Sequence, residues 1–274
     1  MSKHKNSLPK STELNIAFIH GWGMNPGAFT QIINELNVQL KSQFGDENSR
    51  FNVQNISLPG HGDKHDLIPE PYDLEQIAIN IGAELAKNSI VIAWSLGGLV
   101  GQYLASQGHP NIIGLLTIAS TPKFQMTPEW PGIKPQVLQM FMQQLTKNHN
   151  QTLTRFLAIQ MMGVDNPKQL IKDITKAIGV YPAPNIEALS AGLTILQDAD
   201  IRDKLQHIEV PTLRLYGRLD SLVPHDAVNQ IQNLQPQSKS LVIKHASHAP
   251  FLTDAKVFCQ HIVDFIASVA KVTN

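Results

Sequence analysis

The chain has 274 residues, of which 42% are hydrophobic and 16% charged, so it is long enough and apolar enough to bury one large core. Lys+Arg and Asp+Glu both number 22, and this balance does not indicate a nucleic-acid or membrane-surface partner. Residues 1–7 lack the apolar segment of a secretory signal, no apolar run is long enough to span a bilayer, and the single cysteine excludes an internal disulfide, so we expect a cytoplasmic protein.

Short β-branched or apolar runs alternate with helical stretches over most of the chain. Strands are predicted at Leu14–Ile19, Phe51–Ser57, Ser89–Ala93, Ile112–Ile118, Val210–Tyr216 and Lys239–Lys244. Helices are predicted at Pro26–Leu40, Asp73–Lys87, Gly97–Gln107, His225–Leu234 and Asp254–Ala270. This alternation is typical of an α/β fold with a mostly parallel central sheet and helices on both faces. Gly45–Arg50 is interpreted as a mobile loop before the second strand.

The alternation stops between residues 121 and 198, where helical periodicity continues without a convincing strand. The helices expected there are Pro135–Leu145, Thr152–Met162, Pro167–Val180 and Asn185–Leu196. We interpret this segment as a helical cap, or lid, inserted after the fourth strand and lying over the catalytic edge of the sheet. The predicted division is therefore 1–120 and 199–274 for the core and 121–198 for the cap.

Ser95 lies between a predicted strand and a predicted helix, within Ala93–Gly98. A serine flanked by small residues at such a junction is typical of a nucleophile elbow, a tight turn that presents the hydroxyl outward. The start of the helix also brings backbone N–H groups and the positive end of the helix dipole toward a developing oxyanion. Ala93 takes the place of the more common glycine and adds a methyl group to a crowded turn.

An aspartate and a histidine follow Ser95 in the chain order of hydrolases with this architecture. Asp220 comes in the turn after the fifth predicted strand, and His248 follows the sixth. Asp226 and His245 are the nearest rivals, but Asp226 suits the N-terminus of the next helix and His245 lies closer to the strand end. We predict that His248 removes the Ser95 proton and that Asp220 orients and stabilises the imidazolium.

The segment His20–Gly23 follows the first predicted strand, where a second oxyanion donor belongs. We predict an oxyanion hole made by the backbone N–H groups of Trp22 and Leu96. His20 is expected to shape this loop, and His61 is interpreted as a loop residue without a clear partner. The sequence holds no histidine–acid spacing typical of a metal site, no phosphate loop and no dinucleotide fingerprint, so we expect neither a metal nor a cofactor.

Six stretches carry a resemblance to known proteins: His20–Gly23, Trp94–Val100, Glu129–Pro135, Arg155–Gln160, Leu213–Gly217 and His248–Phe251. Together they resemble the α/β-hydrolases with a cap and, more narrowly, the pimeloyl-[acyl-carrier-protein] methyl ester esterases of biotin synthesis. The stretches around Ser95 and His248 are general to the superfamily, whereas those in the predicted cap are much more specific. The resemblance covers about Leu14 to Phe265, and it departs from the family at Ala93 and in the longer loop Gly45–Arg50.

The resemblance implies a serine carboxylesterase that hydrolyses the methyl ester of a seven-carbon dicarboxylate held by acyl carrier protein. It also implies a substrate-binding set of Trp22, Ser95, Leu96, Phe156, Leu157, Ala158, Ile159, Gln160 and His248. The predicted triad alone indicates only a serine hydrolase acting on an acyl substrate. Two alternatives therefore stay open: a general short-chain carboxylesterase or carbon–carbon bond hydrolase with the same triad, and a ligand-binding hydrolase scaffold without turnover.

The predicted cap is basic. Between residues 121 and 180 there are seven basic and three acidic residues, a net charge of +4 in a chain that is neutral overall. Lys168, Lys172 and Lys176 recur every four residues and so share one helix face, which could simply be a solvated face. Because the implied carrier protein is acidic, we predict that Arg155, Lys168 and Lys172 dock it beside the pocket mouth. We expect a monomer, with neither nucleic acid nor a membrane as partner.

Overall fold

The computed structural model describes residues 13–272, so the segment 1–7, expected to lack a secretory signal, lies outside the described residues. Six strands form one sheet in the order β2-β1-β3-β4-β5-β6, and every neighbouring pair is parallel. The strands are β1 (Leu14–Ile19), β2 (Phe51–Ile56), β3 (Ser89–Trp94), β4 (Ile112–Ile118), β5 (Thr212–Gly217) and β6 (Lys239–Ile243). The predicted fold class is confirmed.

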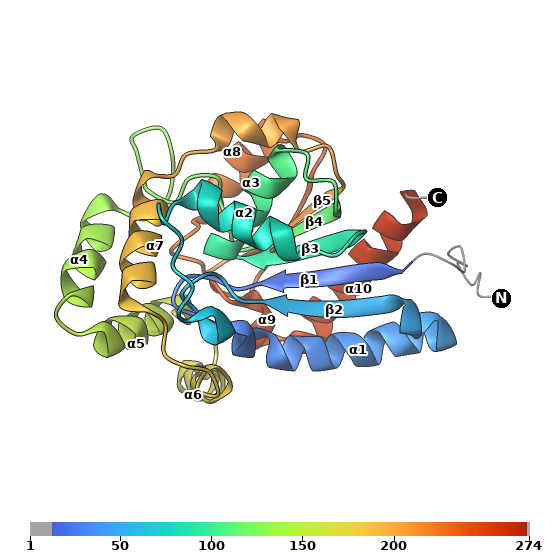
Figure 1. Ribbon diagram of the computed structural model, residues 1–274, viewed down its shortest axis with the longest axis horizontal. Coiled ribbons are helices and arrows are strands. Elements are labelled where there is room, and N and C mark those ends of the chain that lie inside the picture. Colours follow the sequence, from blue (N-terminus) through green and yellow to red (C-terminus); the bar gives the residue numbers. More distant parts are fainter. Residues whose placement is uncertain (1–12, 273–274) are drawn as a thin grey trace.

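Helices cover both faces of the sheet (Figure 1). One face packs against α1 (Thr30–Phe44) and α10 (Ala255–Val272), and the other against α2 (Leu74–Glu84), α3 (Leu96–Ser106) and α8 (His225–Leu234). The short helices are α9 (Pro250–Thr253) and the 3-10 helices η1 (Pro26–Phe29), η2 (Gly45–Arg50), η3 (Gly62–Lys64) and η4 (Arg202–His207). Within residues 13–272, every helix is too short or too polar to span a bilayer.

β3 shows how the sheet separates two apolar cores. All six of its residues are buried, as expected for a central parallel strand covered on both faces. Ile90 and Ile92 belong to the core under α1 and α10, whereas Val91 and Ala93 belong to the core under α2 and α3. This alternation turns Ala93 toward α3, where a Cβ on Gly101 would lie 3.3 Å from the Ala93 Cβ. The small residue in the helix therefore makes room for the methyl group at the elbow.

Four α-helices come between β4 and β5: α4 (Pro135–Leu145), α5 (His149–Gln160), α6 (Pro167–Ile178) and α7 (Ile186–Asp198). They lie beyond the carboxyl ends of the strands (Figure 1). The two ends of this inserted segment are tied together, because the Ile201 N–H donates a hydrogen bond of 3.0 Å to the Pro122 carbonyl oxygen. The helices occur where the periodicity predicts them, and the division into a core and a cap at residues 121 and 198 stays a prediction.

Most elements differ from the prediction by a few residues at one end or both, and three of these differences concern η2, β5 and α5. Gly45–Arg50 forms the 3-10 helix η2 and not a loop. β5 begins at Thr212 and not at Val210, because Pro211 has no N–H to donate to a neighbouring strand. α5 begins three residues before the predicted Thr152, because the Asn148 side-chain oxygen caps the helix by accepting from the Gln151 N–H at 3.0 Å.

Candidate active site

Ser95 stands at a strained turn between β3 and α3. Its φ of +55° is unusual for a residue with a side chain and is typical of a functional turn. The turn needs glycine at two following positions. A Cβ on Gly97 would lie 2.4 Å from the His20 carbonyl oxygen, and one on Gly98 would lie 2.5 Å from the Ser120 Cβ. The sharp turn is therefore possible because the second and third residues of α3, Gly97 and Gly98, lack side chains.

The structure brings Ser95, His248 and Asp220 together at the carboxyl edge of the sheet. His248 Nε2 lies 2.8 Å from Ser95 Oγ, and His248 Nδ1 lies 2.9 Å from Asp220 Oδ2. The other carboxylate oxygen, Asp220 Oδ1, accepts from the backbone N–H groups of Leu222 at 2.8 Å and Val223 at 3.0 Å. All three side chains are buried, with at most 5% of each residue exposed. The carboxylate is thus held where it can accept a hydrogen bond from Nδ1–H, which leaves Nε2 free to accept the serine proton.

The two rival residues lie elsewhere. Asp226 is exposed in the first turn of α8, where a carboxylate complements the helix dipole. His245 is exposed in the turn after β6. His248, in contrast, is anchored through its backbone: its N–H donates to the Gln160 carbonyl at 3.2 Å, and its carbonyl accepts from Trp94 Nε1 at 2.8 Å. Sequence reasoning missed both anchors, since no local pattern marks them.

The predicted oxyanion loop lies directly against the elbow. A Cβ on Gly21 would be 3.1 Å from the Ser95 Cβ, so the backbone of this loop passes beside the serine. β1 and β3 are neighbours although β2 separates them in the chain, and α/β sheets bind ligands at such a reversal of strand order. Trp22 follows β1 and Leu96 follows Ser95. The structure therefore brings the backbones of the two predicted donors to the same strand ends.

His20 and His61 form a buried pair behind this loop. His20 Nε2 accepts from the Leu58 N–H at 3.0 Å, so its Nδ1 carries the proton donated to the Gly21 carbonyl at 2.9 Å. The His61 ring lies 5.4 Å from the His20 ring, and its Nδ1 donates to the Pro59 carbonyl at 2.9 Å. Burial lowers the pKa of both, that of His61 to about 4. His20 shapes the loop as predicted. His61 is a loop residue as predicted, but its Nδ1 does have a partner, whereas its Nε2 has none among the described residues.

α5 carries the stretch expected to contact the substrate. Phe156 packs edge-on against Trp22, with ring centroids 4.8 Å apart, and the Trp22 indole N–H donates to the Leu189 carbonyl of α7 at 2.9 Å. The side chains of Phe156, Leu157 and Gln160 are buried, that of Ile159 is half-buried and that of Ala158 is exposed. Helical periodicity turns Ala158 outward. The structure therefore places it away from the buried side of α5, where the other predicted substrate-binding residues of this helix lie. The buried Gln160 Oε1 has no hydrogen-bond partner among the described residues.

The three residues predicted to dock a carrier are all exposed. Arg155 lies on α5, where its guanidinium donates to Gln144 Oε1 at 2.8 Å. Lys168 and Lys172 lie on α6, which contacts α5. The sequence-predicted basic helix face is therefore present, together with Lys176, on the outside of the inserted segment.

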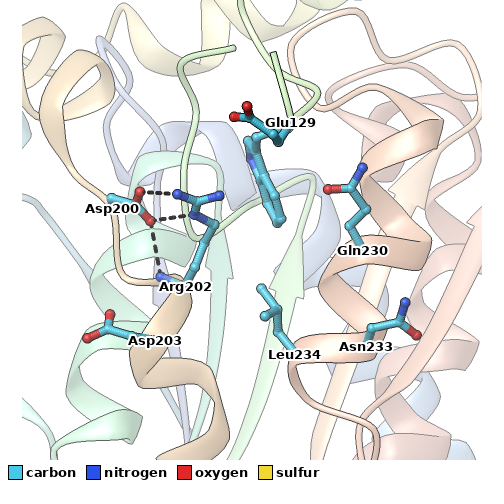
Figure 2. Close-up of a pocket in the computed structure, with 8 residues that line it drawn as sticks. Glu129, Asp200, Arg202, Asp203, Gln230, Asn233 and Leu234 are labelled. Atoms are coloured by element: carbon cyan, nitrogen blue, oxygen red, sulfur yellow. Dashed lines mark hydrogen bonds and ion pairs between the residues drawn. The ribbon is translucent and has the colours of Figure 1, made fainter. Parts of the chain in front are cut away.

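A separate groove lies between the loop that carries Trp130, the start of η4 and the end of α8 (Figure 2). Its lining residues are Glu129, Trp130, Asp200, Arg202, Asp203, Gln230, Asn233 and Leu234, and they include none of the predicted triad. The Arg202 guanidinium lies over the Trp130 ring at 5.1 Å and pairs with Asp200, which also binds Lys123 at 3.1 Å. Burial alone would raise the pKa of Asp200, but the hydrogen bonds from Arg202 and Lys123 outweigh it and lower the pKa to about 2. The cluster thus ties the two ends of the inserted segment together.

The arrangement around Ser95 can carry out nucleophilic attack on an acyl carbonyl. A buried serine at a strained elbow is hydrogen-bonded to a histidine, and the histidine is hydrogen-bonded to an aspartate. Among the described residues, no three histidine, cysteine, aspartate or glutamate side chains gather closely enough to hold a metal ion. A six-stranded parallel sheet with this geometry at its carboxyl edge defines the α/β hydrolase class.

Comparisons with known proteins agree with that class and narrow it. The sequence profile described as the alpha/beta hydrolase fold matches residues 15–255. The protein from Vibrio cholerae serotype O1 named pimeloyl-[acyl-carrier protein] methyl ester esterase is 39% identical over 251 residues, which cover 92% of this chain and 93% of that protein. The protein of the same name from Pseudoalteromonas atlantica is 40% identical over 245 residues, which cover 89% of this chain and 91% of that protein.

Among solved structures, an esterase from Exiguobacterium antarcticum superposes with a TM-score of 0.80 at 20% identity, covering 93% of this chain and 92% of that one. At that identity the likeness concerns the fold alone. The chain belongs to the α/β hydrolase fold family and, within it, to the family of the pimeloyl-[acyl-carrier protein] methyl ester esterases.

Proposed function

We propose that this chain is a serine carboxylesterase that hydrolyses the methyl ester of pimeloyl-[acyl-carrier protein]. The observation that carries the proposal is the near full-length similarity, at 39% and 40% identity, to two enzymes of that name. The hydrogen bonds that join Ser95, His248 and Asp220 support an esterase mechanism and the role proposed for each residue.

In the first half of the reaction, Ser95 Oγ attacks the carbonyl carbon of the methyl ester while His248 Nε2 takes the serine proton. Asp220 stabilises the imidazolium through Nδ1, from which it lies 2.9 Å away. The backbone N–H groups of Trp22 and Leu96 hold the oxyanion of the tetrahedral intermediate. His248 then gives its proton to the departing methoxide, so methanol leaves and the acyl group stays bonded to Ser95 Oγ.

In the second half, His248 takes a proton from water, and the resulting hydroxide attacks the acyl carbon. The same two N–H groups hold the second oxyanion, and His248 returns a proton to Ser95 Oγ as the acyl bond breaks. The product is a free carboxylate whose other end is still held by the carrier. The enzyme returns to its starting state without any cofactor.

The residues proposed to contact the substrate include apolar surface of the kind that an acyl chain needs. Phe156 and Trp22 contribute aromatic surface, and both are almost fully buried. The unpartnered Gln160 Oε1 is a buried acceptor on the same helix. Because buried polar atoms normally find a partner, we propose that a donor of the bound substrate or an ordered water satisfies it.

The decisive experiment supplies the gene to a bacterial strain that requires biotin because it lacks this esterase. The wild-type chain should restore growth without biotin, and Ser95→Ala should not. In vitro, the purified protein should release methanol from the methyl ester of pimeloyl-carrier protein. Efficient hydrolysis of unrelated short esters or diketones, with no methanol release from the carrier-bound ester, would favour one of the broader hydrolase functions instead.

We also propose that the carrier protein docks on the exposed basic residues of α5 and α6. Complementary charge mainly accelerates encounter and sets orientation, so the effect should depend on salt. A variant with all three basic residues changed to glutamate should have a much lower kcat/KM for the carrier-bound ester and nearly wild-type activity on a small free ester. The residues to change are Arg155, Lys168 and Lys172. Equal losses on both substrates would mean that the changes damaged the inserted segment and that this face is not the docking surface.

A further inference from the structure

A buried cation that the proposed mechanism does not use lies behind the nucleophile. Arg214, on β5, is fully buried, and its guanidinium lies between side chains from α3 and from the end of α8. None of the ion pairs among the described residues includes it. Burial lowers the pKa of Arg214, but an arginine stays charged in a protein. Apolar residues of similar volume often stabilise a core as well or better, so this buried charge suggests a role other than stability.

A chain of hydrogen bonds runs from Arg214 to the elbow. Arg214 Nη1 donates to Gln102 Oε1 at 2.8 Å, and Gln102 Nε2 donates to Ser120 Oγ at 3.2 Å. Ser120 Oγ in turn donates to the main-chain carbonyl oxygen of Ser95 at 2.8 Å. Gln102 Nε2 also donates to the Gly98 carbonyl at 3.0 Å, so the same amide contacts the first turn of the helix that follows the serine.

The arginine sets the direction of this chain. A guanidinium only donates, so Gln102 must turn its oxygen toward Arg214 and its amide nitrogen toward Ser120. The Ser120 hydroxyl then accepts from Gln102, and its single hydrogen is left for the Ser95 carbonyl. On the far side of the guanidinium, Arg214 Nη2 donates to Gln235 Oε1, which orients that amide in the same way.

The series of hydrogen bonds from Arg214 ends at a point of backbone strain. Ser95 has a φ of +55° after β3, and Ala119 has a φ of +46° after the neighbouring β4. Such conformations persist only where surrounding contacts hold them. The Ser120 hydroxyl, one residue after Ala119, joins the two turns through the Ser95 carbonyl. We propose that Arg214 is a positioning residue, which holds the nucleophile elbow in its reactive geometry through Gln102 and Ser120. The inference rests on the proposed role of Ser95 as the nucleophile.

The test compares two variants that pair the same arginine with a carboxylate on opposite sides. In Gln102→Glu, the carboxylate accepts from Arg214 and also from Ser120, so the hydroxyl hydrogen turns away from Ser95. In Gln235→Glu, the carboxylate accepts from Arg214 on the side remote from the elbow, and the chain to Ser95 is preserved. Hydrolysis of p-nitrophenyl butyrate gives kcat and KM for each variant, and thermal unfolding reports whether each is folded.

We expect Gln102→Glu to lower kcat about tenfold or more while KM stays within about twofold, because small displacements of a reacting group are costly in rate. Gln235→Glu should keep kcat and KM within about twofold of the wild type. Ser120→Ala removes only the last donor of the chain and should lower kcat as Gln102→Glu does. The pH dependence of the residual activity should be unchanged in all three, since His248 and Asp220 are untouched.

Wild-type kcat in both Gln102→Glu and Ser120→Ala would overturn the proposal, and so would an equal loss of kcat in Gln235→Glu. Labelling of the wild-type protein with a fluorophosphonate separates this failure from a failure of the mechanism. If Ser95 is labelled and the variants are fully active, the positioning role is refuted. If Ser95 is not labelled in the wild type, its role as the nucleophile is refuted.

Discussion

His61 should make the folded protein sensitive to acid. Burial against the oxyanion loop lowers its pKa from 6.5 to about 4, so the unfolded chain binds the proton more readily than the folded one. The stability contributed by neutral His61 is therefore fully present above pH 6.5 and is lost as the pH falls from 6.5 to about 4. At 1.36 kcal/mol per pKa unit, the whole loss is about 3 kcal/mol, most of it complete by about pH 4.5.

The variant His61→Asn isolates this contribution. The asparagine amide places an N–H near the position of His61 Nδ1, which donates to the Pro59 carbonyl, but it does not titrate. Urea unfolding at about pH 7.5 and pH 4.5 gives the loss of unfolding free energy between the two values for each protein. The wild type should lose about 2 to 3 kcal/mol more than His61→Asn. Carboxylates that titrate in this range affect both proteins and cancel in the comparison.

A matched control changes a histidine outside the buried pair. His245 is exposed, so His245→Asn should lose as much unfolding free energy on acidification as the wild type does. If His61→Asn and the wild type lose equal amounts, His61 is not held neutral by its burial, and the reasoning is refuted.

Four further substitutions, one of them a control, address the site itself. Ser95→Ala should abolish esterase activity and leave the thermal unfolding transition in place, because it removes only the attacking hydroxyl. Asp220→Asn should lower turnover on the order of 10⁴-fold, whereas Asp226→Asn should retain it; the reverse outcome in the same p-nitrophenyl ester assay would show that the acid is misassigned. Gly192→Ala would set a Cβ 2.6 Å from the Trp22 ring, so kcat should fall about tenfold or more as the indole shifts, despite the better helix propensity of alanine. Unchanged kcat in that variant would show that the position of Trp22 does not matter for turnover.

Much of the fold follows from local patterns. The predicted bounds of β1 and β4 coincide with the structure, because mostly apolar runs bounded by polar or turn residues allow few other assignments. Boundaries shifted where a single residue decided them. Asn148 capped α5 earlier than the apolar pattern indicated, and Pro211 delayed the start of β5.

The order of Ser95, Asp220 and His248 along the chain predicted that these residues would meet, since parallel strands all end at one edge of a sheet. The sequence by itself therefore determined the fold class, the helical nature of the inserted segment and the candidate triad. The catalytic roles of the three triad residues and the docking role of the basic helix face stay predictions. The fold class and the inserted helices could be predicted because hydrophobic periodicity is visible in short stretches of sequence.

Only the tertiary structure decided which polar groups would be buried and what they would contact. Gln160 and His248 are joined by a backbone hydrogen bond across 88 positions, and Arg214 contacts Gln102 across 112. No short stretch of sequence encodes such a pair, because each partner is an ordinary residue in its own helix, strand or loop. His61 likewise reads as a loop residue until the packing of the loop buries it against His20. Burial and partners of polar groups depend on how distant elements pack, and that is settled by the whole fold.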